Sequence, residues 1–232
     1  MKENIRLLFP FSVPSSPIPQ QIFFYVKDDK LVSILSLHQE QQQWKAIAFT
    51  HPDERHKGYF SALFHAAIKQ IKNSDHYPLL FYQDHQSVDT EKTLLAIPCQ
   101  YLYSEILMQK DDLHPPLCIP SSRFKEQDLS LLLIYENKQL VYQAYLQNHL
   151  VASCRIYLFT KSFYFFDLYV QPFYRQKGYA QHFLCKIFKE LEQYHKKPLR
   201  LQVNSKNLHA LHLYKKLNFY IQEKLSYYIY NL

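Results

Sequence analysis

The sequence predicts an α/β fold of the α+β kind, made of two tandem units that each carry a mixed, mostly antiparallel central sheet flanked by helices. The 232-residue chain has only two glycines, Gly58 and Gly178, where ordinary usage would give roughly 16. Each stands at the same place in one of two similar segments, PDERHKGY from Pro52 and PFYRQKGY from Pro172. This repeat predicts a duplication, with backbone coming close to another group at each glycine.

The first unit has the signals of three strands, one long helix and a further strand, helix and strand. Alternating apolar residues predict strands at 21–25, 31–37 and 44–50. After the repeated segment, apolar residues at helical spacing predict a helix with one buried face: Phe60, Leu63, Phe64, Ala67, Ile68 and Ile71. A strand at 78–82, a helix at 90–97 and a terminal strand at 101–108 complete this unit, which we place at residues 1–112.

The second unit, residues 113–232, repeats this order. Strands are expected at 140–146, 150–158 and 163–170, and a helix follows with the same apolar spacing: Ala180, Phe183, Leu184, Ile187, Phe188 and Leu191. A strand at 199–203, a helix at 207–217 and a strand at 219–230 come next. Three prolines mark residues 111–122 as a linker. Residues 124–137 are expected to form an additional helix, capped by Ser121 or Ser122.

Composition indicates a globular protein of the cytoplasm, with neither a membrane nor a metal partner. Apolar residues make up 47% of the chain, and no apolar stretch approaches the roughly 18–20 residues of a membrane span. The apolar run near the N-terminus is cut by Pro10, so we expect no signal peptide. The four cysteines form no CxxC pair and are expected to be buried free thiols. The histidines form no HExxH motif.

Charge is concentrated in the second unit. The whole chain has a formal net charge of +7, but residues 117–232 carry 16 Lys and Arg against 7 Asp and Glu, a balance of +9. We therefore expect the second unit to hold any polyanionic ligand. A nucleic-acid partner has only the high pI and the abundant aromatics in its favour, because no run of five or six basic residues occurs. We expect no nucleic-acid partner.

The repeated segment has the character of a phosphate cradle. A strand ends in an Arg-x-Lys-Gly-Tyr loop that opens a helix, where unpaired backbone N–H groups and the helix dipole favour an anion. Arg175 and Lys177 add positive charge, and Gly178 removes a side chain from the place where a diphosphate would approach. The alternative is a left-handed turn that binds nothing. Two copies in a chain otherwise free of glycine favour the cradle.

These residues resemble the GNAT acetyltransferases, here as a tandem pair of domains. Arg175–Ala180 matches the family signature [Q/R]-x-x-G-x-[G/A], and Asp167–Pro172 is similar to its central strand. Residues 207–219 resemble a second signature, N-x-x-A-x-x-[LF]-Y-x-[KR]-x-G-F, with Asn218 in place of glycine. Asparagine is the next-best residue for the left-handed geometry at a helix end. The resemblance covers residues 138–230.

The resemblance implies an N-acetyltransferase that moves the acetyl group of acetyl-CoA directly to a primary amine in a ternary complex, with its active site in the C-terminal half. The implied cofactor-binding residues are Leu168, Tyr169, Val170, Arg175, Gln176, Lys177, Gly178, Tyr179, Ala180 and Asn207. Tyr214 would protonate the departing thiolate, which suits a neutral phenol; ordinary aromatic core is its alternative. Asp167 is the candidate base, and its alternative is an ion-pair partner or N–H acceptor on the strand.

The first unit departs from this pattern and is expected to be a degenerate GNAT-like domain. Phe60 stands where Gly or Ala is usual, Ile47 replaces the counterpart of Asp167, and Ser87 replaces that of Asn207. No tyrosine occurs near Leu94, where the counterpart of Tyr214 would fall. The unit is then a poor CoA binder without catalysis, or a scaffold that closes the acceptor pocket.

Two questions of function stay open at the level of sequence. The alternative to an enzyme is a non-catalytic acyl-CoA-binding or regulatory protein with the same fold; the intact Asn207 and Tyr214 count against it. The acceptor is a small-molecule or peptide amine. The protein is expected to be a monomer, as a pseudo-dimer formed by duplication, or a homodimer.

Overall fold

The computed structural model describes residues 5–8, 20–72, 77–84, 88–113, 129–194 and 197–232. The chain forms two compact units. Unit 1 consists of Met1–Tyr103 and Leu225–Leu232, and unit 2 of Ser104–Lys224. Within the described residues each contains parallel and antiparallel strand pairs and two α-helices, which agrees with the α/β class that the sequence predicts.

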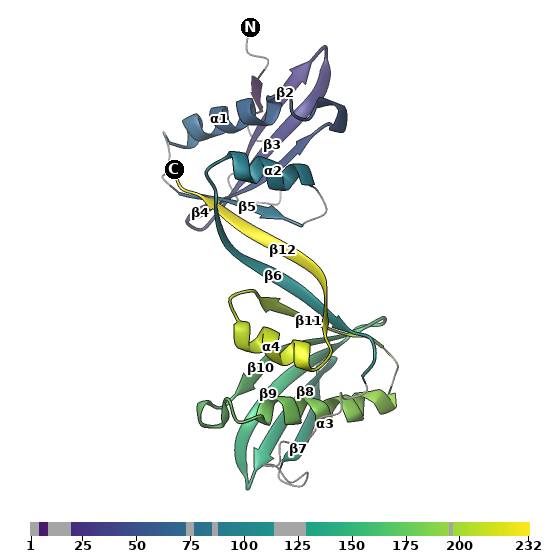
Figure 1. Ribbon diagram of the computed structural model, residues 1–232. Helices are drawn as coiled ribbons and strands as arrows, with labels where there is room; N and C mark the ends of the chain where they lie inside the picture. The colour runs from purple at the N-terminus through teal and green to yellow at the C-terminus, as the bar shows by residue number, and fades with distance from the viewer. Residues whose placement is uncertain (1–4, 9–19, 73–76, 85–87, 114–128, 195–196) are drawn as a thin grey trace. The chain divides into compact units, whose positions relative to one another are not determined.

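In unit 1, four antiparallel strands come first: β1 (Ile5–Leu8), β2 (Gln20–Lys27), β3 (Lys30–Glu40) and β4 (Gln43–Thr50). β5 (Leu79–Gln83) pairs parallel to β4. Helices α1 (Tyr59–Ile71) and α2 (Val88–Ala96) lie on either side of β5 in the sequence. Helix α1 lies against the strands of this unit (Figure 1). The apolar residues predicted for its buried face belong to the same core as the buried Trp44, which confirms the prediction that they form core.

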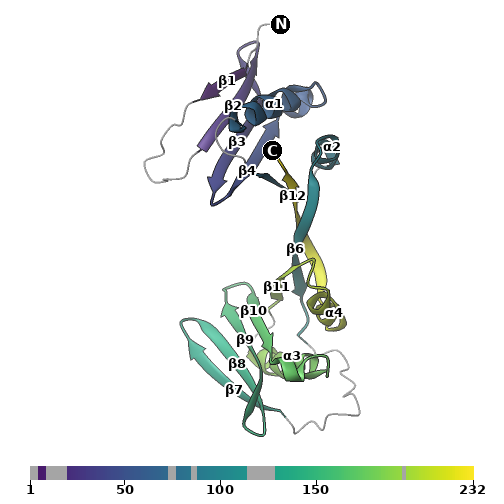
Figure 2. The ribbon, with the colours of Figure 1, turned by 90° about the vertical axis from the view of Figure 1, so that its left-hand side faces the viewer.

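Unit 2 repeats this arrangement. The antiparallel strands are β7 (Ser130–Glu136), β8 (Gln139–Leu146), β9 (His149–Leu158) and β10 (Phe163–Val170). β11 (Leu199–Asn204) pairs parallel to β10. Helices α3 (Tyr179–Tyr194) and α4 (Leu208–Lys216) pack on one face of this sheet (Figure 2). The apolar side chains of that face and of α3 form one buried core.

The last strand of each sheet comes from the other half of the sequence. β6 (Gln100–Lys110) follows α2, yet its residues 105–110 pair antiparallel with β11. β12 (Tyr220–Tyr230) follows α4, yet its residues 226–230 pair antiparallel with β5. In the predicted division at residue 112, each half keeps its own terminal strand. The compact units differ from that division because the paired part of each terminal strand belongs to the other unit. Local pattern predicts a strand but does not determine the strand with which it pairs.

The expected helix at 124–137 is wrong where the structure describes it, because residues 130–136 form strand β7. A two-residue turn at Asn137 and Lys138, with φ of 46° and 65°, joins β7 to β8. Positive φ at both central residues is typical of hairpin turns. The leucine-rich residues 131–133 fit the apolar spacing of a helix as well as that of a strand. The hairpin turn that follows pairs them with β8 and so makes them a strand. Residues 114–128, including the expected caps Ser121 and Ser122, lie outside the described residues.

Three further findings bear on composition. Cys154 is a buried free thiol, as expected, and Cys99 is a free thiol that is only half-buried. Cys185 is disulfide-bonded, so the expectation is wrong for that residue, and Cys118 lies outside the described residues. No helix within the described ranges is long and apolar enough to cross a membrane. The same part of the chain holds no cluster of three or more His, Cys, Asp or Glu side chains that could bind a metal ion.

Candidate functional site

The site of unit 2 begins at a bulge in β10. The register between β10 and β9 shifts between Phe166 and Tyr169, and Asp167 there has a φ of 53°. The corresponding strand of unit 1, β4, pairs with β3 from Thr50 to Gln43 without a shift. A bulge re-aims the residues that follow it and interrupts pairing. The two units therefore differ in backbone as well as in side chains.

Beyond the bulge, β10 and β11 separate. Their pairing covers only Phe163–Phe165 opposite Leu199–Leu201. On the other side, the Gln171 amide donates to the Val151 carbonyl at 2.9 Å. Because antiparallel pairs alternate, the backbone groups of Leu168 and Val170 point away from β9, toward the gap left by β11. This exposed strand segment can form strand-like hydrogen bonds with an extended ligand.

The loop after β10 has the geometry of the predicted cradle. It contains a single 3₁₀ turn (Pro172–Tyr174), and Gln176 and Gly178 have φ values of 57° and 88°. α3 begins directly afterwards, so the unpaired N–H groups of its first turn lie at the end of this loop. The positive φ explains why residue 178 is a glycine, because residues that carry a side chain rarely adopt this backbone conformation. At Gly58, also at positive φ, an added Cβ would meet nothing within 4 Å, so the predicted close approach is not seen there.

The two cations of this loop have no carboxylate partner within the described residues. Arg175 Nε donates to the Val170 carbonyl at 2.9 Å and so ties the loop to the end of β10. Its guanidinium also lies 5.7 Å from the centre of the Tyr169 ring. Lys177 Nζ lies over the Phe173 ring at 4.0 Å. Both charges are available to an anion at the start of α3.

Tyr214 lies on α4 and is 6% exposed. Its ring packs edge-on against Phe165, where the β10–β11 pairing ends, and against Phe219. Burial raises the pKa of the phenol above its ordinary value. The phenol is therefore neutral and able to donate a proton at pH 7, although its ring also serves the core, so both roles named for Tyr214 are compatible.

Asn207 and Asn218 mark the two ends of α4. Asn207 Oδ1 accepts a hydrogen bond from the Ala210 amide at 3.1 Å and caps the helix. Its Nδ2 group is the part that can donate to a ligand. Asn218 has a φ of 63°, the left-handed geometry expected where the family signature has glycine.

Asp167 is placed by the bulge but is not buried. Its side chain is 65% exposed and lies 3.9 Å from Arg155 Nε on β9. The ion pair predicted as its alternative role is therefore present, in a weak and solvated form. A carboxylate so exposed can exchange this partner for an incoming amine.

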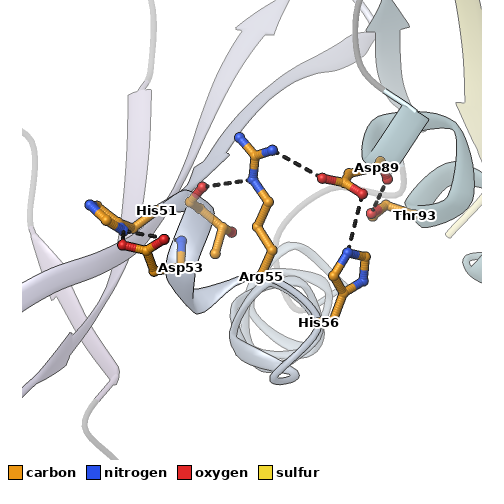
Figure 3. A network of polar contacts seen from close by, with 7 residues as sticks. His51, Asp53, Arg55, His56, Asp89 and Thr93 are labelled. Atoms are coloured by element: carbon orange, nitrogen blue, oxygen red, sulfur yellow. Dashed lines mark hydrogen bonds and ion pairs between the residues drawn. The ribbon is translucent and has the colours of Figure 1, made fainter.

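The equivalent loop of unit 1 is neutralised by its own chain. Arg55 Nη1 and His56 Nε2 lie 3.0 and 3.1 Å from the two carboxylate oxygens of Asp89, on the first turn of α2 (Figure 3). Lys57 Nζ lies 3.2 Å from Glu54. The hydrogen bond from Arg55 is the main cause that holds the pKa of Asp89 below its usual range. The hydrogen bond from Lys57 is likewise the main cause that lowers the pKa of Glu54. Asp89 was not predicted from the sequence. The feature that could have pointed to it is an acidic residue in the first turn of α2.

Other residues of unit 1 also differ from their counterparts in unit 2. Leu94, at the position in α2 that Tyr214 has in α4, is buried in the core. Ile47 is exposed on the unbulged β4. Phe60 packs on the core at the start of α1. Ser87 lies outside the described residues.

One further carboxylate near the gap was also missed. Glu105 on β6 accepts hydrogen bonds from Gln202 Nε2 and Asn204 Nδ2 of β11, each at 3.3 Å. It comes from the terminal strand that the sequence assigned to the other sheet, so no pattern in the sequence placed it at this site.

Comparison with known proteins agrees with the fold. The sequence profile of the Acetyltransferase (GNAT) family matches residues 104–219. A GCN5-related N-acetyltransferase from Sphaerobacter thermophilus has a similar fold (TM-score 0.62, 12% identity, covering 90% of this chain and 80% of that one).

Two more solved structures share the fold. A tandem GNAT protein from the clavulanic acid biosynthesis pathway has a TM-score of 0.58 at 12% identity, covering 92% and 83% of the two chains. A GNAT-family acetyltransferase from Colwellia psychrerythraea has a TM-score of 0.53 at 11% identity, covering 98% and 99%. No protein of curated function matches the sequence. The chain belongs to the GNAT acetyltransferase family.

Proposed function

We propose that the protein is an acetyl-CoA-dependent N-acetyltransferase that acetylates a primary amine, with its active site in unit 2. The observation that carries this is the gap beside β10, which lies between a cationic loop at a helix start and the buried phenol of Tyr214. A diphosphate suits the loop and a thioester arm suits the exposed strand. Unit 1 lacks the bulge, the free cations and the phenol.

The residues divide the proposed chemistry between them. The backbone of Leu168 and Val170 holds the acetyl and pantetheine portion, and the loop from Arg175 to Ala180 holds the pyrophosphate. Asn207 contacts the pantetheine arm through Nδ2. The amine nitrogen, after losing one proton, attacks the thioester carbon; an N–C bond forms and the C–S bond breaks.

Three proton transfers accompany this step. Asp167 takes the first proton from the ammonium form of the amine, directly or through a water molecule, and the nitrogen loses its second proton to solvent once the N–C bond has formed. Tyr214 donates its proton to the departing thiolate sulfur and regains one from solvent afterwards. Direct transfer in a ternary complex needs no covalent acyl-enzyme.

Calorimetry with acetyl-CoA tests the cradle. Lys177→Glu is expected to weaken binding about 10-fold or more, since a cation is lost and an anion gained, whereas the matched Lys57→Glu leaves binding unchanged. Both side chains lie in exposed loops, so folding is not at risk. Equal losses in the two variants, or none in either, would contradict the assignment of the cofactor to unit 2.

A second measurement separates the enzyme from an acyl-CoA-binding protein. Release of free CoA is followed with a panel of primary amines. Turnover that requires Tyr214 supports the transferase, and binding of acetyl-CoA without turnover of any amine favours the binding protein.

A further inference from the structure

The face of the unit 2 sheet opposite α3 and α4 has an unusual surface beside the gap. Side chains on this face alternate with those of the core. On β10 they include Tyr164 and Phe166, next to Asp167; on β11 they include Gln202 and Asn204. Since α4 and Tyr214 lie on the other face, an acceptor that approaches a thioester in the gap from this side meets neither of them.

This surface carries charges of both signs, and Glu105 is a carboxylate on it with no cationic partner among the described residues. Glu105 is half-buried, and its recorded hydrogen bonds come from the neutral amides of Gln202 and Asn204. No Lys, Arg or His of the described chain forms an ion pair with it. The basic residues of this face have other partners: Arg155 pairs with Asp167, and Arg200 Nε donates to Gln109 Oε1 at 2.6 Å. A half-buried carboxylate of this kind favours a cationic ligand.

Four aromatic rings lie together on this face, and Tyr164 links them to Glu105 through Gln202. Tyr157 stacks on Phe159 and on Phe166, with ring centres 5.5 and 5.8 Å apart. Tyr164 meets Phe159 and Phe166 at 6.4 Å and reaches toward Glu105, its hydroxyl donating to Gln202 Oε1 at 3.3 Å. We call these four rings the aromatic wall. Phe159, at 51% exposed, offers its ring most openly.

We propose that this surface is the acceptor site and that the acceptor is a cationic amine carrying an aromatic or flat apolar group. This rests on the proposed function of unit 2. The ammonium group binds at Glu105 before it is deprotonated, and the apolar group stacks on the aromatic wall. An α-carboxylate on the acceptor would place a second negative charge near Glu105, so free amino acids are poor acceptors.

Steady-state kinetics with three probes tests the proposal: phenethylamine, n-butylamine and phenylalanine. Phenethylamine is expected to have the lowest KM. Glu105→Gln raises its KM about 10- to 100-fold, because a charged hydrogen bond is lost, while kcat changes less. The matched change Glu136→Gln, on the edge strand of the same sheet, leaves KM unchanged. Phe159→Ser raises KM for phenethylamine and not for n-butylamine.

An unchanged KM in Glu105→Gln, or equal use of phenylalanine and phenethylamine, overturns the proposal and leaves the transferase intact. If acetyl-CoA binds but no amine turns over, the proposed function fails, and the acceptor site is still tested by calorimetry. Phenethylamine is titrated into the protein saturated with CoA. Binding that Glu105→Gln weakens supports the site, and absent or unaltered binding overturns it.

Discussion

Arg55 and Asp89 form an ion pair, with Nη1 and Oδ2 3.0 Å apart, that joins the loop before α1 to the first turn of α2 (Figure 3). Asp89 also pairs with His56, so one carboxylate holds two groups of the loop. Arg55 and Arg175 each donate from Nε to the carbonyl five residues earlier, at the end of the preceding strand. The difference lies in the helix: in unit 2 the position of Asp89 is taken by His209, so Arg175 has no such carboxylate partner within the described residues. The same loop has thus become a structural link in one unit and a candidate ligand site in the other.

The link predicts a pH-dependent contribution to the stability of unit 1. Arg55 lowers the pKa of Asp89 in the folded state, so the stabilisation is complete above the unfolded pKa of about 3.9 and is lost as pH falls through the folded value. Asp89→Asn should lower the urea midpoint at pH 7. The difference from wild type should shrink below about pH 4. A difference that stays constant down to pH 2 would contradict this role.

Replacing the buried phenol should separate catalysis from binding. Tyr214→Phe is expected to lower kcat about 100-fold, as for the loss of a general acid, with little change in acetyl-CoA affinity. Because burial raises the pKa of Tyr214, the wild-type kcat should not fall through loss of this proton below about pH 10. A fall in acetyl-CoA affinity equal to that in kcat would instead assign Tyr214 to packing.

The role of Asp167 can be tested against that of its partner. Asp167→Asn should lower kcat about 10- to 100-fold, as for the loss of a general base. Arg155→Gln breaks the same exposed ion pair and should leave kcat within a few-fold. If the two variants lower kcat equally, the ion pair between Asp167 and Arg155 is what catalysis needs, and the base is a water molecule or another group.

The bulge in β10 is itself open to mutation. Its conformation places Asp167 at a φ of 53°, which asparagine tolerates and a β-branched residue does not. Asp167→Val should therefore cost stability and weaken acetyl-CoA binding together, whereas Asp167→Asn affects kcat alone. Thermal unfolding and calorimetry on the two variants check this. Equal acetyl-CoA affinity in both would show that the bulge is not needed for the cofactor.

Much of the fold could be predicted because its signals are local. Helical spacing of apolar residues defined α1 and α3, and the short spacing from Asn207 to Tyr214 placed the cap and the phenol on one helix. The loop from Arg175 to Gly178 is likewise set by neighbours in the sequence. These features need no knowledge of distant contacts.

The features that sequence reasoning missed depend on pairing across long separations. The contacts of Asp89 with Arg55 and of Glu105 with Asn204 depend on how α2 and β6 pack. The bulge at Asp167 forms in the pairing of β10 with β9, and the sequence there has no glycine that would indicate a bulge. Strand β7 was mistaken for a helix because its leucines fit both periods and its turn uses Asn137 and Lys138.

Because β6 pairs with β11 and β12 pairs with β5, each half of the chain depends on the other half to complete its sheet. A fragment ending near residue 112 would lack the partner of β5, and one beginning there would lack the partner of β11. Each would expose an open sheet edge and be prone to aggregate. Mixed together, the fragments could restore each other's sheets. No single cut between the two halves therefore leaves both sheets with all their strands.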